Sequence, residues 1–336
     1  MIAAGGDAGM DAPHDMVLDN NGRLQVIFYD RLQRRLYYAQ LHEGAWLTEV
    51  VTQTDVSPYA DAAVSLAVDD LNRPHISYKI GRDTADLVYA HDDGSGWTFE
   101  VLDQPYNTPN AIDVDSQGRP HIAYCGDGGL HYTYWSGSEW STATLNDGCF
   151  YTVDMKLDSL DRPHIAFDSG YTFHYASWTG AELADQVLDR DELVYDASLD
   201  LDSLDRPHLF YRYDWYVKYA RWNGSEWEME AVTPEGTSAP IHGGETSMTL
   251  DAGDRPHLAW CQWDEGLHYA RLIQGNWRVQ LVDDRFCSTS SSRGTSIVLD
   301  NAGRPLIGYH LELEGDFMLA SRPVLEEHIY LPAIMK

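Results

Sequence analysis

One short pattern, Asp-x-x-x-Arg-Pro-His, returns along the 336-residue chain and limits what it can fold into. Five complete copies supply the recurring residues Asp69, Arg73 and His75; Asp115, Arg119 and His121; Asp158, Arg162 and His164; Asp202, Arg206 and His208; and Asp251, Arg255 and His257. Incomplete copies at residues 19–25 and 300–306 begin and end the series. The seven arginines stand at positions 23, 73, 119, 162, 206, 255 and 304, so successive copies are 43 to 50 residues apart. A period of this length is typical of repeat architectures.

Each repeat predicts four short β-strands. An alternating apolar stretch ends at the Asp, as at residues 64–69, and the turn after it always ends in Gly, Asn or Asp. These residue types tolerate a left-handed backbone, so we expect a tight hairpin, with the Pro opening the second strand. A third strand ends at or near Tyr-Ala, as at Tyr89, and a fourth starts at a Trp in most repeats, as at Trp97. Because no stretch has a sustained 3.6-residue apolar period, essentially no helix is expected.

Seven copies of this unit predict an all-β fold, a seven-bladed β-propeller with four antiparallel strands per blade. Each blade buries its faces only against its neighbours, so the recurring Tyr, Trp and Ile or Leu positions should form the core between blades. We expect the propeller to span residues 15–331, between a flexible N-terminal leader at 1–14 and a C-terminal tail at 332–336. Its last strand is expected at 324–330, so that chain ends and blade ends coincide.

Two stretches before the fourth strand, residues 92–97 and 136–140, are degenerate forms of the Asp-box, Ser-x-Asp-x-Gly-x-x-Trp. The repeats therefore resemble those of the sialidase-like propeller superfamily with bacterial neuraminidase repeats. In that superfamily the first strand lines the central channel and the fourth is outermost, which implies the same order here. The Arg-Ile-Pro element expected of a sialidase is absent. The resemblance thus implies the fold and does not carry sialidase activity.

This strand order separates two faces of the ring. The turns between strands one and two and between three and four are short and repetitive, and we call their side the turn face. The loops between strands two and three and between blades are long and dissimilar, as at residues 105–110, 189–196, 234–245 and 283–295. We call their side the variable face. Variable loops on a rigid scaffold usually carry function.

The chain is strongly acidic, with 53 Asp and Glu against 23 Lys and Arg and a formal charge of −30. Such a surface repels nucleic acid, anionic membranes and polyanionic glycans. Neutral ligands, basic proteins and divalent cations remain compatible with it, as does a simple solubility or salt adaptation. No apolar run is long enough to span a bilayer. We expect no nucleic-acid partner, no membrane insertion, and a monomer or part of a larger extracellular assembly.

The repeated Asp, Arg and His suggest metal ligands or acid–base groups, but they occur once per blade around a ring. A functional site needs one location, whereas an Asp can cap its own turn and bind the Arg and His beside it. We interpret these residues as a structural repeat and predict no metal site or cofactor, while a structural divalent cation such as calcium stays compatible with the acidity.

The four cysteines occupy two equivalent pairs of positions. Cys125 and Cys261 follow the second strand of the third and sixth repeats, and Cys149 and Cys287 lie in the loops that leave those repeats. The pattern predicts two disulfides, Cys125–Cys149 and Cys261–Cys287. Since disulfides form in oxidising compartments, we expect a secreted or cell-surface protein whose leader has been removed.

Aromatic and acidic residues are concentrated in loops of the variable face: Tyr106, Phe150, Tyr151, Asp168, Asp191, Glu192, Tyr213, Asp214, Trp215, Trp263, Asp264 and Glu265. Exposed aromatics beside carboxylates suit sugar rings and protein contacts equally well. Two loops bearing Trp and a long connection bearing His should converge between blades five and six. The predicted ligand site there consists of Arg212, Tyr213, Asp214, Trp215, His242, Glu245, Trp263 and Asp264. The alternative is that both Trp residues only pack beneath the long loop.

These features favour a secreted β-propeller binding module whose ligand is a neutral carbohydrate or a protein. One alternative is a secreted polysaccharide-active enzyme, either a lyase built on Arg212, Tyr213, His242 and His310 or a hydrolase with a carboxylate pair. Another is a structural subunit of a surface assembly. The sequence contains no phosphate-binding loop, no Gly-x-Ser-x-Gly elbow and no His-Glu-x-x-His motif.

Overall fold

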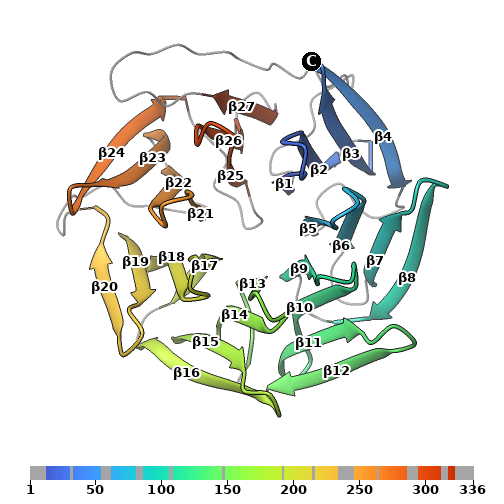
Figure 1. Cartoon of the computed structure of the whole chain (residues 1–336), viewed down its shortest axis with the longest axis horizontal. Helices are drawn as coiled ribbons and strands as arrows, with labels where there is room; N and C mark the ends of the chain where they lie inside the picture. Colours follow the sequence, from blue (N-terminus) through green and yellow to red (C-terminus); the bar gives the residue numbers. More distant parts are fainter. Residues whose placement is uncertain are drawn as a thin grey trace.

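The computed structural model describes residues 13–30, 33–53, 62–80, 86–105, 109–145, 148–190, 193–213, 216–233, 246–262, 265–285, 294–311 and 317–321. Every regular element in this part of the chain is a β-strand, so it contains no helix that is able to cross a membrane. The strands form seven sheets around a central channel (Figure 1). The predicted all-β, seven-bladed propeller is confirmed.

Within each sheet the strands pair in sequence order and antiparallel. Blades 1 to 4 contain β1 (His14–Leu18), β2 (Leu24–Asp30), β3 (Arg35–His42) and β4 (Ala45–Gln53); β5 (Ala62–Val68), β6 (Pro74–Ile80), β7 (Leu87–Asp92) and β8 (Trp97–Asp103); β9 (Asn110–Val114), β10 (Pro120–Gly126), β11 (Gly129–Trp135) and β12 (Trp140–Leu145); and β13 (Val153–Leu157), β14 (Pro163–Asp168), β15 (Thr172–Trp178) and β16 (Leu183–Arg190). Blades 5 to 7 contain β17 (Val194–Leu201), β18 (Pro207–Tyr213), β19 (Tyr216–Trp222) and β20 (Trp227–Ala231); β21 (Thr246–Leu250), β22 (Pro256–Gln262), β23 (Gly266–Ile273) and β24 (Asn276–Asp283); and β25 (Thr295–Leu299), β26 (Pro305–His310) and β27 (Phe317–Ser321).

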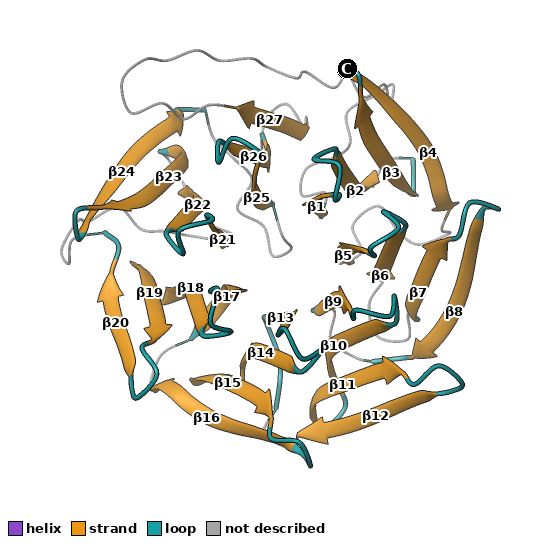
Figure 2. Ribbon diagram, in the orientation of Figure 1, coloured by secondary structure: helices purple, strands orange, loops and turns teal. Residues whose placement is uncertain are grey.

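The first strand of each blade is innermost, and in blades 1 to 6 the fourth forms the rim (Figures 1 and 2). Second strands such as β6 and β10 are buried along their whole length, while outer strands such as β8 are largely exposed. This order is the one that the resemblance to sialidase-like propellers implies. The fourth strand predicted for blade 7, the leader at 1–14 and the tail at 332–336 lie outside the described residues or at their edge, so those boundaries and the manner of ring closure stay predictions.

The Asp of the repeated pattern organises its own turn, as blade 2 shows. Asp69 Oδ1 accepts the backbone N–H groups of Leu71 (3.0 Å) and Arg73 (2.8 Å), and Oδ2 accepts Arg73 Nε–H at 2.6 Å. Behind the turn, His75 Nδ1 lies 2.7 Å from the Tyr89 hydroxyl, and its Nε2 lies 3.7 Å from Asp69. Equivalent contacts recur in blades 3 to 6. The geometry is that of a structural unit repeated around the ring.

The pKa values of this unit follow from burial and pairing. Burial raises the pKa of Asp69, but the hydrogen bonds and charge of Arg73 outweigh it and hold that pKa below its ordinary value. Burial lowers the pKa of His75 to about 4. Burial lowers the pKa of the other four motif histidines as well, which favours the neutral form of all five near pH 7.

One of the two predicted disulfides, Cys125–Cys149, is present, with Cα atoms 4.9 Å apart. It ties the end of β10 to the connection between blades 3 and 4. Cys261 is also in a disulfide. Because Cys287 lies outside the described residues, the pairing Cys261–Cys287 stays a prediction.

Candidate functional site

The predicted ligand site between blades 5 and 6 falls largely outside the described residues. Arg212 is described in full, and Tyr213 only as the last backbone position of β18. The others are not described: Asp214, Trp215, His242, Glu245, Trp263 and Asp264. Their convergence therefore stays a prediction. Arg212 itself is buried, and its guanidinium carbon lies 4.5 Å from the ring centroid of Tyr195.

The described part of the variable face carries a group of three aromatic side chains over blades 4 and 5, which we call the aromatic platform. It consists of Phe150 and Tyr151, from the connection between β12 and β13, and Tyr195, near the start of β17. The ring centroids of Phe150 and Tyr151 are 6.4 Å apart, and those of Tyr151 and Tyr195 are 5.5 Å apart. Their exposed fractions are 47, 50 and 38%, so all three rings present area to a ligand.

A buried carboxylate fixes the backbone beneath this platform. Asp168, at the end of β14, is fully buried, and its Oδ1 accepts the N–H groups of Tyr151 (2.7 Å), Thr152 (2.9 Å) and, more weakly, Phe150 (3.4 Å). Its Oδ2 accepts the N–H of Gly170 at 3.1 Å. Burial raises the pKa of Asp168, although these backbone hydrogen bonds oppose the shift.

Two glycines make room for the ring of Phe150. Gly148 and Gly170 both have positive φ, +79° and +84°. A Cβ at Gly148 would lie 2.8 Å from the Phe150 ring, closer than real contacts allow, and one at Gly170 would touch the same ring at 3.7 Å. The disulfide at Cys149, the Asp168 carboxylate and these glycines together hold the Phe150 and Tyr151 segment in one conformation.

Arg212 supports the other end of the platform. Its side chain extends from β18, where it pairs across the sheet with Asp196 of β17, and its guanidinium lies against the face of Tyr195. A cation held against an aromatic face at this distance is stabilised by the ring quadrupole. The one fully described residue of the predicted ligand site thus serves the aromatic platform.

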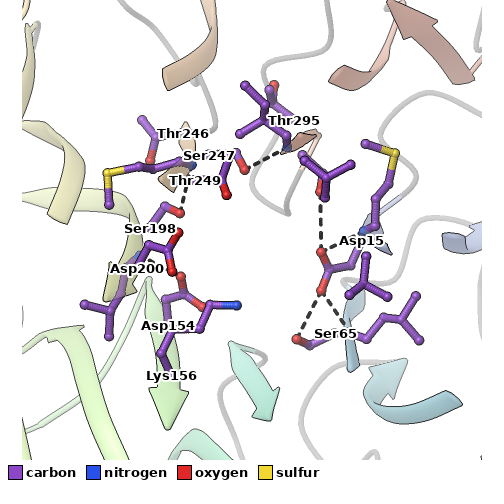
Figure 3. Close-up of a pocket in the computed structure, with 18 of the residues that line it drawn as sticks. Asp15, Ser65, Asp154, Lys156, Ser198, Asp200, Thr246, Ser247, Thr249 and Thr295 are labelled. Atoms are coloured by element: carbon purple, nitrogen blue, oxygen red, sulfur yellow. Dashed lines mark hydrogen bonds between the residues drawn. The ribbon is translucent and has the colours of Figure 1, made fainter. Parts of the chain in front are cut away.

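The central channel is a polar concavity with a volume of about 340 Å³ (Figure 3). Its walls are the inner strands, and the polar side chains of the lining are mainly Ser, Thr and Asp, with Lys156 among them. Burial acts to lower the pKa of Lys156, but the carboxylates of Asp113, Asp200, Asp154 and Asp15 outweigh it and raise that pKa above its ordinary value. The ammonium group is therefore charged and a poor nucleophile.

The channel carboxylates serve as ties between blades. Asp113, Asp154 and Asp200 accept the backbone N–H groups of Leu157 (2.9 Å), Leu199 (2.8 Å) and Leu250 (2.8 Å), each in the inner strand of the next blade. An inner strand is a sheet edge with unpaired N–H groups, and these carboxylates satisfy them. Within the described ranges, no group of three or more His, Cys, Asp or Glu side chains is placed to hold a metal ion.

Comparison with known proteins agrees with the fold. No protein-family model and no curated protein matches the chain. Among solved structures, a variant of the Aleuria aurantia lectin in complex with Fucalpha1-6GlcNAc aligns over 96% of this chain and 95% of its own, with 11% identity and a TM-score of 0.55. The lectin AofleA from Arthrobotrys oligospora aligns over 97% and 88%, with 9% identity and a TM-score of 0.57. A variant of the NanB sialidase from Streptococcus pneumoniae aligns over 92% and 67%, with 9% identity and a TM-score of 0.51.

The chain shares the propeller fold with these proteins. At 9 to 11% identity the likeness reaches no further than architecture. The match to NanB confirms the fold-level resemblance to sialidase propellers. The number of blades is not shared throughout, since the Aleuria aurantia lectin is described as six-bladed and this chain has seven blades.

Proposed function

We propose that this protein binds a neutral carbohydrate through the aromatic platform on its variable face. The observation that carries the proposal is the rigid presentation of three half-exposed rings, Phe150, Tyr151 and Tyr195, over a disulfide and a buried carboxylate. Aromatic faces pack against the apolar C–H faces of sugar rings, and the phenol hydroxyls bond to sugar hydroxyls. A surface that is already ordered loses little conformational entropy on binding.

The charge of the chain selects a neutral ligand over an acidic one. With a formal charge of −30, the protein repels polyanionic glycans at long range. Stacking on aromatic rings needs no ligand charge and is unaffected by this repulsion. The complexes of similar folds with fucose-containing ligands support a carbohydrate as the ligand class, without specifying the sugar for this chain.

The observed geometry favours binding over catalysis. A glycoside hydrolase needs two carboxyl groups free to act on the substrate, whereas Asp113, Asp154 and Asp200 are engaged in ties between blades. The lyase group considered above included Arg212 and His310, but Arg212 belongs to blade 5 and the buried His310 to blade 7, with blade 6 between them. The enzyme alternative thus has less support than a binding module.

The Cys125–Cys149 disulfide supports a location outside the cytoplasm. Disulfides persist in oxidising compartments and are rare where thiols are kept reduced. A secreted or cell-surface position also puts a carbohydrate-binding platform where free and surface-bound glycans occur.

A glycan array followed by calorimetry tests the proposal with three purified proteins: the unchanged chain, Phe150→Ala and Phe99→Ala. Phe99 lies on the outer strand β8 and is 49% exposed, so it is a matched control for the loss of an exposed phenyl ring. Removing one stacking ring should weaken binding by roughly 1.5 kcal/mol, about tenfold in Kd. Binding to neutral glycans that Phe150→Ala leaves unchanged, or that Phe99→Ala weakens equally, would refute the platform as the site.

A further inference from the structure

A second concavity lies between blades 5 and 6 on the turn face, the side opposite the aromatic platform. It has a volume of about 410 Å³, within the range of small-ligand sites. Its walls come from the first turn of both blades, around Arg206 and Arg255, and from the end of β19 at Arg221 and Trp222. We call it the inter-blade cavity.

The third-strand residue that pairs with the motif histidine varies between blades, and it is Ser177 in blade 4 and Arg271 in blade 6. In blades 2 and 3 the corresponding residues are His91 and Tyr134, whose rings stack on the motif histidines with centroids 5.9 and 5.6 Å away. In blade 5 the residue is Arg221, which turns outward to Glu228 on β20, with Nε at 2.8 Å and Nη2 at 2.7 Å. No aromatic ring from this position stacks on His208, which lines the cavity.

Blade 6 departs from the repeat at the rim of the same cavity. Where blades 2, 4 and 5 carry an exposed leucine at the tip of the first turn, blade 6 has Gly253, which leaves the rim open. The side chain of Arg255 beside it is 72% exposed, against 31 to 54% for the five other motif arginines that pair with their Asp. Arg221 of blade 5 and Gly253 of blade 6 thus both border the cavity.

The polar groups of the cavity are balanced in charge. Arg206, Arg221 and Arg255 each use one edge on a carboxylate, those of Asp202, Glu228 and Asp251, at 2.6 to 2.7 Å. Each guanidinium has five N–H donors, so other donors remain for a ligand. Asp202 and Asp254 line the cavity themselves, while Glu228 and Asp251 pair with its arginines from outside the lining, so the three guanidinium charges are offset by carboxylates. Neither an anion nor a cation gains much from such a neighbourhood.

A ligand rich in hydroxyl groups fits this arrangement, because a hydroxyl both accepts from a guanidinium and donates to a carboxylate. Trp222 adds an apolar ring, held edge-on against Trp227 at a centroid distance of 5.8 Å. We propose that the inter-blade cavity is a second binding site, which takes a single neutral sugar residue.

The two sites point in opposite directions. Strand β18, with seven residues, spans about 20 Å between the two faces at roughly 3.3 Å per residue. One sugar residue cannot occupy both. If the aromatic platform binds carbohydrate as proposed above, the chain is bivalent and bridges two glycan-bearing molecules or surfaces.

Calorimetric titration tests whether the chain has two sugar sites. The neutral probes are the methyl glycosides of glucose, galactose and fucose and a disaccharide built from two of these sugars. Glucuronate and glucosamine serve as charged probes. The variants are Arg255→Gln and Arg221→Gln in the cavity, Phe150→Ala on the platform, and Arg304→Gln as matched control. Arg304 makes the same pair with its Asp, at 2.6 Å, away from this cavity. We expect two sites per chain, one of which weakens at least tenfold in either cavity variant and is unchanged in Arg304→Gln.

The outcomes separate this inference from the proposed function. A single site that depends on Phe150 and ignores Arg255 overturns the cavity alone, and so does an equal loss in Arg304→Gln. A single site that depends on Arg255 and ignores Phe150 supports the cavity and overturns the platform. Tighter binding of glucuronate or glucosamine than of every neutral probe by tenfold overturns the neutral class. Failure of every probe to bind the unchanged chain overturns both proposals.

Discussion

Replacing Asp168 with Ala should loosen the aromatic platform and destabilise the fold. Three N–H groups, those of Tyr151, Thr152 and Gly170, lie 2.7 to 3.1 Å from the carboxylate and would lose their acceptor. A buried donor left unsatisfied costs about 1–3 kcal/mol, which gives a gross loss of roughly 3–9 kcal/mol. Removing a fully buried carboxylate returns part of this, since burial raises the pKa of Asp168 and so opposes its charged form. We expect a net loss near the lower end, about 3 kcal/mol.

Asp168→Asn separates the hydrogen bonds from the charge. The amide oxygen can still accept from Tyr151 and Thr152, but the amide NH₂ then faces the N–H of Gly170, a donor against a donor. The expected loss is about 1–2 kcal/mol, smaller than in the Ala variant.

Urea unfolding followed by tryptophan fluorescence measures both variants against the unchanged chain, and calorimetry with the best glycan measures the platform. Both variants should bind the glycan more weakly than the unchanged chain, and the less stable Ala variant should bind it most weakly. An Ala variant within 1 kcal/mol of the unchanged chain, or an Asn variant as unstable as the Ala variant, would show that Asp168 does not organise this segment through its acceptor oxygens.

Three further predictions concern the propeller itself. The free energy of unfolding should fall as the pH drops from 6.5 toward 4. Burial lowers the pKa of all five motif histidines, to about 4 for His75, so in this range the unfolded chain binds more protons than the folded chain. Urea midpoints that rise as the pH drops over this range would contradict the prediction. Cys125→Ser should lower the free energy of unfolding by about 3 kcal/mol, because it opens the loop closed at Cys149. Non-reduced peptide mapping should recover both predicted disulfides. Four alkylatable thiols would contradict both the pairing and the secreted location. Ser159→Ala removes the hydroxyl hydrogen bond to Asp205 in the next blade, at 2.5 Å, and keeps the backbone N–H bond at 3.0 Å. Thermal unfolding should show a loss of about 1 kcal/mol, absent from the exposed control Ser138→Ala.

The blades were predictable because the residues that determine each hairpin are close together in the sequence. A turn that needs positive φ favours Gly, Asn or Asp, and the structure gives φ of 62° at Asn72, 59° at Asp161 and 74° at Gly118. The Pro and the alternating apolar residues on either side set the pairing of the two strands. All of this lies within about ten residues of sequence, so a repeated motif is sufficient to identify it.

The binding surfaces were less predictable because they depend on contacts between distant residues. Phe150 and Tyr151 stood out as variable-loop aromatics, and Tyr195 lies in the long loop at 189–196, but the sequence does not show that its ring lies beside theirs. Its position follows from packing against Arg212 and from the placement of β17 next to the connection that holds Tyr151. The inter-blade cavity likewise needs Arg206 and Arg255 from different blades. Sequence order alone says which blades are neighbours, and does not say which side chains leave a gap between them.

One contact between blades is nevertheless indicated by a residue pattern in the sequence. Ser116, Ser159 and Ser203 follow the motif Asp of blades 3, 4 and 5, and each donates its backbone N–H and hydroxyl to the last turn residue of the next blade. Those acceptors are Asp161, Asp205 and Asp254. Positive φ alone would favour Gly at these positions, so the choice of Asp reflects the serine one blade earlier.

Where the preceding blade has no such serine, the turn residue is free to be Gly. Blade 2 has Asp70 at the serine position and blade 3 has Gly118; blade 6 has Ala252 and blade 7 has Gly303. The same rule reaches across the ends of the ring. The side chain of Asn301 in blade 7 occupies the place that a Cβ at Gly22 of blade 1 would need, so Gly22 is required there by its neighbour as well as by its φ of 72°. Residues 301 and 22 thus stand at the same two turn positions as the Ser–Asp pairs of blades 3 to 6, and their contact identifies blades 7 and 1 as neighbours although nearly the whole chain separates them.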